Sequence, residues 1–148
     1  MLLQFKLFIC VFGLIYYATA LEKDSPLKAV VHKALRATAR QCMEKINATE
    51  DDLEYLRKEP PFPEKSACIL SCLMEKIGVA KNNKYSKNGF MVAISPLVLG
   101  NTKKVEHMRD VSEKCDNEIN HHEVSNCQLG NEIISCIYKY APELHFKN

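Results

Sequence analysis

The chain has 148 residues, of which 20 are Lys or Arg and 18 are Asp or Glu, giving a formal net charge of +2 at pH 7. This near balance gives no reason to expect nucleic acid or an anionic membrane surface as a partner. The length is enough for one domain with a single hydrophobic core.

Residues 1–20 are predicted to form a secretory signal peptide. Lys6 supplies a short basic region, residues 7–17 are almost entirely apolar, and Ala18-Thr19-Ala20 matches the small-residue pattern of a cleavage site. An uncleaved membrane anchor is the alternative, but so short an apolar stretch cannot cross a bilayer as a helix. Cleavage leaves residues 21–148 as one secreted, extracellular domain, in which no segment is long and apolar enough to span a membrane.

The first predicted helix begins at Ser25-Pro26, where a capping hydroxyl precedes a proline at the first helical position. The basic residues that follow are predicted to lie on a solvated outer face. Apolar side chains recur at spacings of three and four residues, as on the buried face of an amphipathic helix, at Leu27, Val30, Val31, Ala34, Leu35, Cys42 and Ile46.

Thr49 and Asp52 are predicted to form a capping box at the start of a second, short helix, which the proline-rich residues 60–63 end. Asn47-Ala48-Thr49 is at the same time an acceptor sequence for N-linked glycosylation in a secreted chain. Thr49 therefore has two interpretations, one as a helix cap and one as part of a glycosylation site at Asn47.

A third helix is predicted after Pro63, with Cys68 and Cys72 on its inner side and Gly78 at its end. These two cysteines are four residues apart, so on a helix they point the same way. That geometry suits bonds to two other segments better than a bond between them.

Residues 81–89 are polar and contain two turn signals, Asn82-Asn83 and Asn88-Gly89. They include no Asp or Glu, which excludes a calcium loop. Residues 90–99 are the least polar stretch of the mature chain, and Pro96 within them predicts a kinked helix that forms one wall of the interior. Plain core and a buried strand are the alternatives.

Two further helices complete the chain. Thr102 is predicted to cap the first, and Ser125 with Gln128 to form a capping box for the second, which runs to about Tyr140 and stops before Pro142. The last helix is apolar around most of its circumference, which is typical of a helix in the middle of a bundle. The fold is thus predicted to be all-α, with about six helices.

The mature chain keeps six of the seven cysteines, because cleavage removes Cys10, and an even set in a secreted chain indicates a disulfide framework. If Cys127 and Cys136 share a helix, they lie roughly 13 Å apart along its axis and cannot pair. Excluding that pair and Cys68–Cys72 leaves about ten of the 15 conceivable pairings open. Each bridge is expected to contribute about 3 kcal/mol, which would allow a hollow interior.

Successive mature cysteines are separated by 25, 3, 42, 11 and 8 residues. With the signal peptide and the helical pattern, this spacing resembles the insect odorant-binding proteins of the pheromone- and general-odorant-binding type, over the whole mature chain. The resemblance implies a carrier of small apolar ligands through extracellular fluid such as sensillar lymph. Only eight residues follow Tyr140, so a short lid is expected in place of a long tail helix. The resemblance also implies an apolar internal cavity enclosed by three interlocked disulfides, Cys42–Cys72, Cys68–Cys127 and Cys115–Cys136.

Candidate ligand-binding residues are the large apolar and aromatic side chains of the third to sixth helices and the tail. Methionine adapts to a ligand's shape, aromatic rings give flat contact area, and a tyrosine hydroxyl could orient one polar ligand atom. Each residue taken singly has ordinary core packing as its alternative. The candidates are Leu73, Ile77, Phe90, Met91, Ile94, Val98, Met108, Ile134, Ile137, Tyr138, Tyr140 and Phe146.

No catalytic residue, cofactor or metal is expected. The histidines match no nucleophile or zinc-protease motif, and cysteines committed to disulfides are neither nucleophiles nor ligands. His121-His122 with Glu123 could ligate a metal, but a solvated turn is the favoured interpretation. His145 beside Phe146 could loosen a lid on acidification, whereas an exposed, uncoupled histidine at a disordered terminus is preferred.

A second class of function is a secreted interaction or scavenger protein on the same disulfide framework. Large exposed apolar patches would favour it. For the carrier, a membrane chemoreceptor and a weak homodimer are partners that the sequence leaves open.

Overall fold

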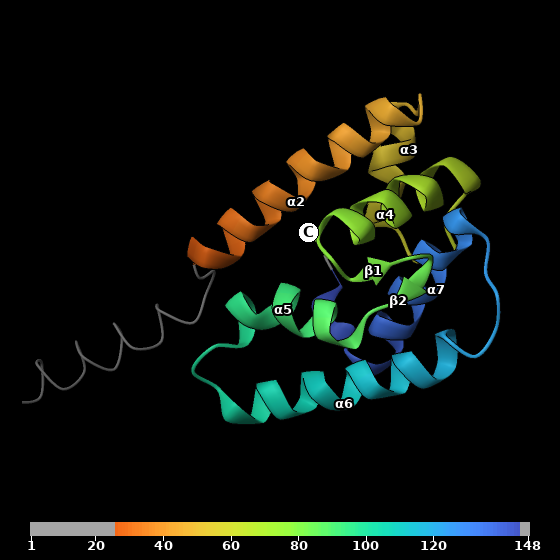
Figure 1. Cartoon of the computed structure of the whole chain (residues 1–148). Helices are drawn as coiled ribbons and strands as arrows, with labels where there is room; N and C mark the ends of the chain where they lie inside the picture. Colours follow the sequence, from red (N-terminus) through yellow and green to blue (C-terminus); the bar gives the residue numbers. More distant parts are fainter. Residues whose placement is uncertain (1–25, 146–148) are drawn as a thin grey trace, which may run out of the picture. The chain divides into compact units, whose positions relative to one another are not determined.

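The computed structural model describes residues 26–145 of the chain (Figure 1). The chain divides into two compact units, residues 1–33 and 34–148. Of the first unit the structure describes only Pro26–Lys33, which is helical and opens α2 (Pro26–Lys45). All other elements belong to the second unit. The predicted signal peptide and Phe146 lie outside the described residues.

The part of α2 that lies in the second unit carries two of the predicted outer-face basic residues. Arg36 pairs with Glu54 at 2.7 Å and Arg40 with Glu50 at 3.4 Å, and all four side chains are largely exposed. Such exposed pairs contribute about 0–1 kcal/mol each, so burial on the opposite side matters more for holding α2. That side includes the fully buried Cys42.

A capping box at Thr49 starts α3 (Glu50–Glu54), as predicted. The backbone N–H of Asp52 donates to the Thr49 hydroxyl oxygen at 3.3 Å, and the Thr49 N–H donates to the Asp52 carboxylate at 2.8 Å. The Thr49 N–H and the Thr49 hydroxyl both donate to the Asp52 carboxylate, and they hold its pKa below its usual range because they favour the charged form. The short 3-10 helix η1 (Tyr55–Arg57) follows before the proline-rich residues.

Helix α4 (Glu64–Lys76) begins directly after Pro63 and is followed by Gly78, whose φ of +81° lies in the left-handed region that glycine favours, both as predicted. It is fixed to α3 by Ser66, whose hydroxyl donates to the Asp52 carbonyl at 2.7 Å. Much of this helix is buried, at Ser66, Ala67, Ile69, Leu70, Ser71, Leu73 and Met74.

A small hairpin follows α4, in addition to the predicted helices. The strands β1 (Ala80–Lys81) and β2 (Lys84–Tyr85) pair antiparallel, with Ala80 opposite Tyr85. Asn82 and Asn83 form the turn, both with φ above +50°, a conformation that asparagine tolerates well. The turn signal was therefore right at this point, and the strands beside it were not predicted.

Helix α5 (Lys87–Val98) starts earlier than predicted. Ser86 caps it by accepting a hydrogen bond from the Gly89 N–H at 3.1 Å, so Asn88-Gly89 lies in its first turn and the turn predicted there is wrong. Pro96 lies inside the helix, as predicted. The proline has no N–H for the carbonyl of Val92, and the Ser95 hydroxyl donates to that carbonyl instead at 2.9 Å.

The last two helices are α6 (Thr102–Ile119) and α7 (Asn126–Tyr140), followed by the 3-10 helix η2 (Pro142–Leu144). The capping predictions for both need correction. Asn101 caps α6 because its carboxamide oxygen can accept from the Lys104 N–H at 3.0 Å, and Thr102 is already helical. Ser125 precedes α7 without a side-chain cap bond, and the Gln128 side chain accepts from the Asn131 carboxamide at 3.2 Å instead of completing a capping box.

Three disulfides join these helices in the pairing that the family resemblance implies. One links α2 to α4, one links α4 to the first turn of α7, and one links α6 to α7, with Cα–Cα distances of 5.8, 4.2 and 5.8 Å. The two cysteines of each bond are separated by 21 or more residues in sequence. The bonds are Cys42–Cys72, Cys68–Cys127 and Cys115–Cys136.

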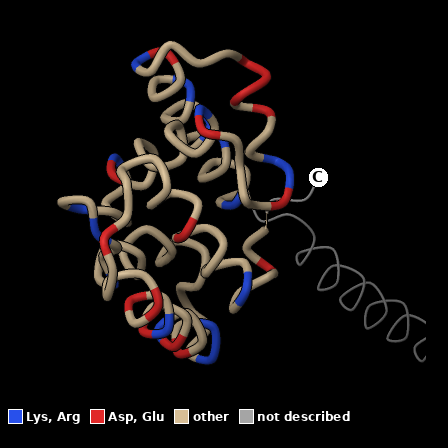
Figure 2. The backbone as a smooth tube through the Cα atoms, turned by 90° about the vertical axis from the view of Figure 1, so that its right-hand side faces the viewer, with Lys and Arg blue, Asp and Glu red and all other residues tan. Residues whose placement is uncertain are grey.

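The protein is therefore all-α apart from the hairpin, with six α-helices among the described residues. One hydrophobic core of buried residues runs through α4, α5, α6 and α7 and includes fully buried Ile69, Val111 and Ile133. Charged residues lie outside it, and Figure 2 shows basic and acidic segments next to each other at the foot of the view. The mixture of signs agrees with the near-neutral composition.

Candidate functional site

The structure brings the predicted ligand-binding residues together from four helices. Seven are buried members of the one hydrophobic core, and four more are half-buried and packed against it. Phe146 lies outside the described residues. The buried seven are Leu73, Phe90, Ile94, Val98, Met108, Ile134 and Ile137, and the half-buried four are Ile77, Met91, Tyr138 and Tyr140.

Sequence reasoning missed Tyr85, which places a polar group inside this apolar core. Its side chain is 4% exposed, its ring centroid lies 6.3 Å from that of Phe90, and its hydroxyl lies 3.2 Å from the Ser112 hydroxyl. Ser112 in turn donates to the carbonyl of Lys87 at 3.3 Å. Burial raises the pKa of Tyr85 to about 12, because the phenolate would be poorly solvated there.

The signal for Tyr85 was present in the sequence. An Asn-Asn pair is a good two-residue hairpin turn, and a hairpin places the next aromatic residue on a strand face. The strand is held to α6 by Asn120, whose carboxamide accepts from the Tyr85 N–H and donates to the Tyr85 carbonyl, both at 2.9 Å. This long-range pair has no local sequence pattern.

His145 is not the exposed terminal residue that was expected. Its side chain is 7% exposed, and its ring meets the ring of Tyr138 edge to face at a centroid distance of 4.4 Å. Its Nε2 lies 3.7 Å from a carboxylate oxygen of Glu59, whereas its Nδ1 is buried with no hydrogen-bond partner among the described residues. The prediction of an exposed His145 is wrong because Tyr138 offers an apolar surface against which the His145 ring packs.

Tyr140 differs from the other candidates in its surroundings. Its hydroxyl donates to the Glu118 carboxylate, and the Lys114 and Lys139 ammonium groups lie 5.0 and 4.7 Å from its ring centroid. The hydroxyl of Tyr140 and the ammonium of Lys139 lower the pKa of Glu118, because both favour its charged form. Tyr140 thus ends the apolar stripe of α7 at a polar surface.

That surface includes an open groove between α6 and α7, of about 260 Å3. Four of its six lining residues are charged or polar, and none of the predicted ligand-binding residues takes part. The lining residues are Glu118, Ile119, Glu132, Ser135, Cys136 and Lys139.

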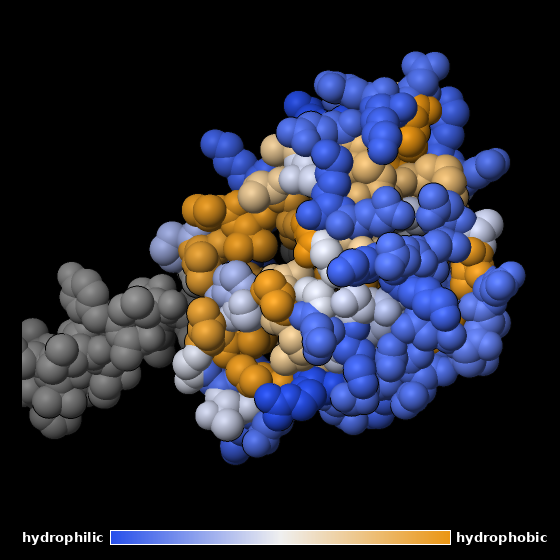
Figure 3. Space-filling model, in the orientation of Figure 1, coloured by the Kyte–Doolittle hydropathy of each residue, from blue (hydrophilic) through white to orange (hydrophobic). Residues whose placement is uncertain are grey.

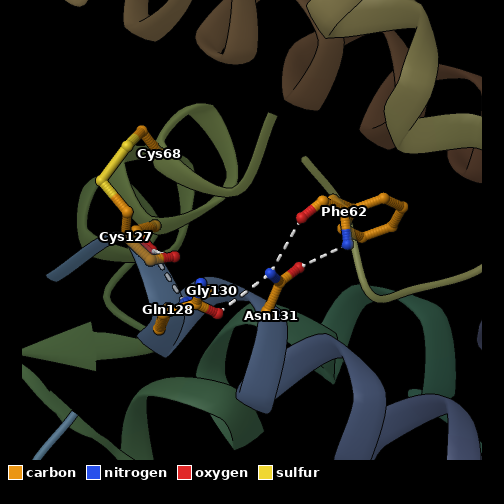
Figure 4. Close-up of a disulfide and its surroundings, with 7 residues drawn as sticks. Phe62, Cys68, Cys127, Gln128, Gly130 and Asn131 are labelled. Atoms are coloured by element: carbon orange, nitrogen blue, oxygen red, sulfur yellow. Dashed lines mark hydrogen bonds between the residues drawn. A yellow bond between two sulfur atoms is a disulfide. The ribbon is translucent and has the colours of Figure 1, made fainter. Parts of the chain in front are cut away.

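Helices α4 and α7 cross at close range beside the Cys68–Cys127 disulfide (Figure 4). The Ser71 hydroxyl donates to the Cys127 carbonyl at 2.9 Å and accepts from the Gly130 N–H at 2.8 Å. A Cβ on Gly130 would lie 2.6 Å from the backbone nitrogen of Ser71, so only glycine allows this separation.

Asn131, directly after Gly130 on α7, holds the chain that enters α4. Its carboxamide oxygen accepts from the Phe62 N–H at 2.9 Å, and its Nδ2 donates to the Phe62 carbonyl at 3.2 Å (Figure 4). Asn131 is 5% exposed and Phe62 is 5% exposed. A buried polar group satisfied in this way fixes one arrangement, because any other would leave the amide without partners.

On the outside of the molecule, hydrophobic residues gather over α5 in the view of Figure 3. Val92 is 72% exposed and Leu99 is 74% exposed, while Met91, Ala93 and Leu97 are half-buried. Within residues 26–145, no helix has the length and apolar character needed to cross a membrane. The same residues contain no group of three or more His, Cys, Asp or Glu side chains arranged to hold a metal ion.

These features define a class of protein: a helical domain, cross-linked by three disulfides around an apolar core, in which the clustered residues carry no evident catalytic group. The chain matches the model of the PBP/GOBP family over residues 24–140 and belongs to that family.

Two individual proteins agree with this assignment. General odorant-binding protein 67 of Anopheles gambiae is 27% identical over 129 residues, which cover 76% of this chain and 63% of that protein. The structure of odorant-binding protein dmelOBP28a from Drosophila melanogaster matches with a TM-score of 0.62 at 21% identity, covering 79% of this chain and 96% of the other. The structural match supports the fold, and the chain spans a little under two thirds of the mosquito relative.

Proposed function

We propose that this protein is a secreted carrier that binds small hydrophobic ligands reversibly in an internal pocket and moves them through extracellular fluid in olfaction. Family membership supports a small-ligand carrier and secretion. The observation that carries the proposal is the convergence of eleven predicted residues from α4, α5, α6 and α7 on one apolar core. The ligand class follows from their chemistry, which is aliphatic, thioether and aromatic with few polar atoms.

The three disulfides support this proposal on physical grounds. Empty or loosely filled space inside a protein costs about 24 cal/mol per Å3, and each bridge is expected to offset about 3 kcal/mol by restricting the unfolded chain. A carrier must also release its guest, which suits micromolar binding of about −8 kcal/mol.

Displacement of a fluorescent apolar probe by alcohols, esters and fatty acids tests the proposal. A matched pair of variants on α5 gives the control. Ile94→Phe adds volume at a buried position, and Val92→Phe makes the same kind of change at an exposed one. We expect Ile94→Phe to weaken probe binding at least tenfold, about 1.4 kcal/mol, and Val92→Phe to leave it unchanged. Equal affinities in both variants would contradict an internal site.

A second candidate function is a secreted interaction or scavenger protein, favoured by the exposed apolar side chains of Val92 and Leu99 on α5. This function would need no internal pocket. If no member of the ligand panel displaces the probe, and lipid extraction of the natively purified protein yields no small molecule, the interaction protein is the better description. A chemoreceptor as partner and a weak homodimer stay predictions.

A further inference from the structure

We infer that Asn47 carries an N-linked glycan in the secreted protein. The acceptor sequence Asn47-Ala48-Thr49 occupies the turn between α2 and α3. Asn47 is exposed and lies in a tight turn, where its φ of +54° is in the left-handed region. A sequon in an ordered helix or in the core would not offer this access.

The contacts of Asn47 leave its side chain available. Its backbone N–H donates to the Glu44 carbonyl at 3.2 Å, and its own carbonyl accepts from the Lys65 ammonium at 3.3 Å. Among the described residues, no hydrogen bond to the side-chain amide of Asn47 is present. The turn is therefore held by main-chain atoms, and a sugar on Nδ2 would break none of these bonds.

The surroundings of Asn47 suit a sugar. Glu44, Lys45, Thr49 and Glu50 are all exposed, so a glycan would lie over polar surface and keep contact with water. In Figure 1 the turn between α2 and α3 lies at the top of the view, away from α5. A glycan there would leave the α5 residues of the proposed ligand site uncovered.

The Thr49 hydroxyl belongs both to the glycosylation sequon and to the cap of α3, and this determines when the glycan is added. In the folded chain this hydroxyl accepts from the Asp52 N–H and donates to the Asp52 carboxylate at 2.8 Å. Because this hydroxyl is already bonded to Asp52 in the folded chain, a transferase that recognises the sequon hydroxyl should engage it before the cap closes. Thr49 then serves first as part of the glycosylation sequon and afterwards as the helix cap, so its two interpretations are compatible.

The inference rests on the proposed secretion, and the experiment tests glycosylation and secretion separately. The full chain is expressed in insect cells, and both medium and cells are analysed by intact mass and by peptide N-glycosidase digestion in heavy-oxygen water, which converts a glycosylated Asn47 to labelled Asp. We expect the secreted wild type to carry a glycan mass and the label at Asn47. Asn47→Asp, which tolerates the left-handed turn and keeps the Thr49 cap, should lose both.

Variants of Thr49 and the other outcomes for the wild type either support or contradict the glycan at Asn47. Thr49→Ser, which preserves hydroxyl and cap, should keep the glycan, and Thr49→Ala should lose it together with cap stability. Wild type in the medium at the bare mass overturns the glycan while secretion stands. A glycosylated chain retained in the cells supports the glycan and contradicts a secreted carrier, and a retained bare chain overturns both. Probe affinity should be equal before and after enzymatic deglycosylation.

Discussion

Replacing Gly130 by alanine should separate α4 from α7 at their closest approach. The added Cβ would lie 2.6 Å from both the backbone nitrogen and the hydroxyl of Ser71, and 3.0 Å from the Ala67 carbonyl oxygen. A Cβ atom essentially never approaches an atom to which it is not bonded as closely as 2.6 Å. Because one of these contacts is to backbone, no side-chain rotation relieves it, and the helices must move apart.

The magnitude follows from three contributions. Overpacking costs about 1–3 kcal/mol. The two hydrogen bonds through the Ser71 hydroxyl, at 2.8 and 2.9 Å, contribute about 1 kcal/mol each and would lengthen when the helices part. Alanine gains about 1 kcal/mol over glycine in helix propensity, which offsets part of this. The free energy of unfolding should fall by about 2–4 kcal/mol, measured by urea denaturation of the oxidised protein with helical circular dichroism as the signal.

The double variant with Ser71→Ala is the sharp control. Removing the hydroxyl eliminates one of the two closest contacts but leaves the backbone nitrogen in place. Gly130→Ala should therefore still destabilise the Ser71→Ala background by more than about 1 kcal/mol. An unchanged unfolding midpoint in either background would show that the crossing is looser than its geometry implies, and the reasoning would be wrong.

Three further predictions concern other parts of the fold. Gly89→Ala should cost more than about 4 kcal/mol, because its Cβ would lie 1.7 Å from the Gly78 carbonyl oxygen, and the yield of folded protein should collapse. Gly100→Ala should cost only about 1–2 kcal/mol, from its φ of +84°, because no atom lies within 4 Å. Wild type should lose about 2–3 kcal/mol relative to Tyr85→Phe between pH 10 and pH 12, because the unfolded chain releases the Tyr85 proton from pH 10.0 upward while the folded chain keeps it to about 12, which parallel denaturation curves would show. Thr49→Ala should lower stability by about 1 kcal/mol at neutral pH and by less at acid pH, where the Asp52 carboxylate that Thr49 binds becomes protonated. Equal losses at neutral and acid pH in thermal unfolding would contradict a charged cap.

The helices and their ends were largely readable from the sequence, because the signals are local. Thr49, Pro63 and Gly78 each act within a few residues, and each was placed correctly. The errors at Thr102 and Ser125 are also local. Asn101, one residue before Thr102, caps α6, and the Gln128 side chain accepts from Asn131 within α7 instead of closing a capping box. Which side chain caps a helix depends on which hydrogen-bond partner lies nearer to it in space.

The disulfide pairing marks the limit of geometric reasoning. Helical spacing excluded only two of the pairs, and the scheme that the structure contains came from the family resemblance. Gly130 was assigned no role and Gly89 was wrongly assigned to a turn, because the space at each is defined by a backbone more than ten residues away in sequence. The grouping of the candidate residues into one core was predictable from their helical periodicity, whereas the buried position of His145 was not.

The contacts along α7 bear on the internal pocket that we propose. Cys127, Gly130 and Asn131 lie on one stripe of the helix, and the stripe continues through Ile134 and Tyr138, since residues three and four apart share a face. Its first half is fixed to α4 and the chain before it by a disulfide, a close backbone approach and a buried amide. None of these contacts depends on what lies against the second half. The apolar residues there can therefore keep their positions with or without a guest, which a core held together only by mutual packing could not do.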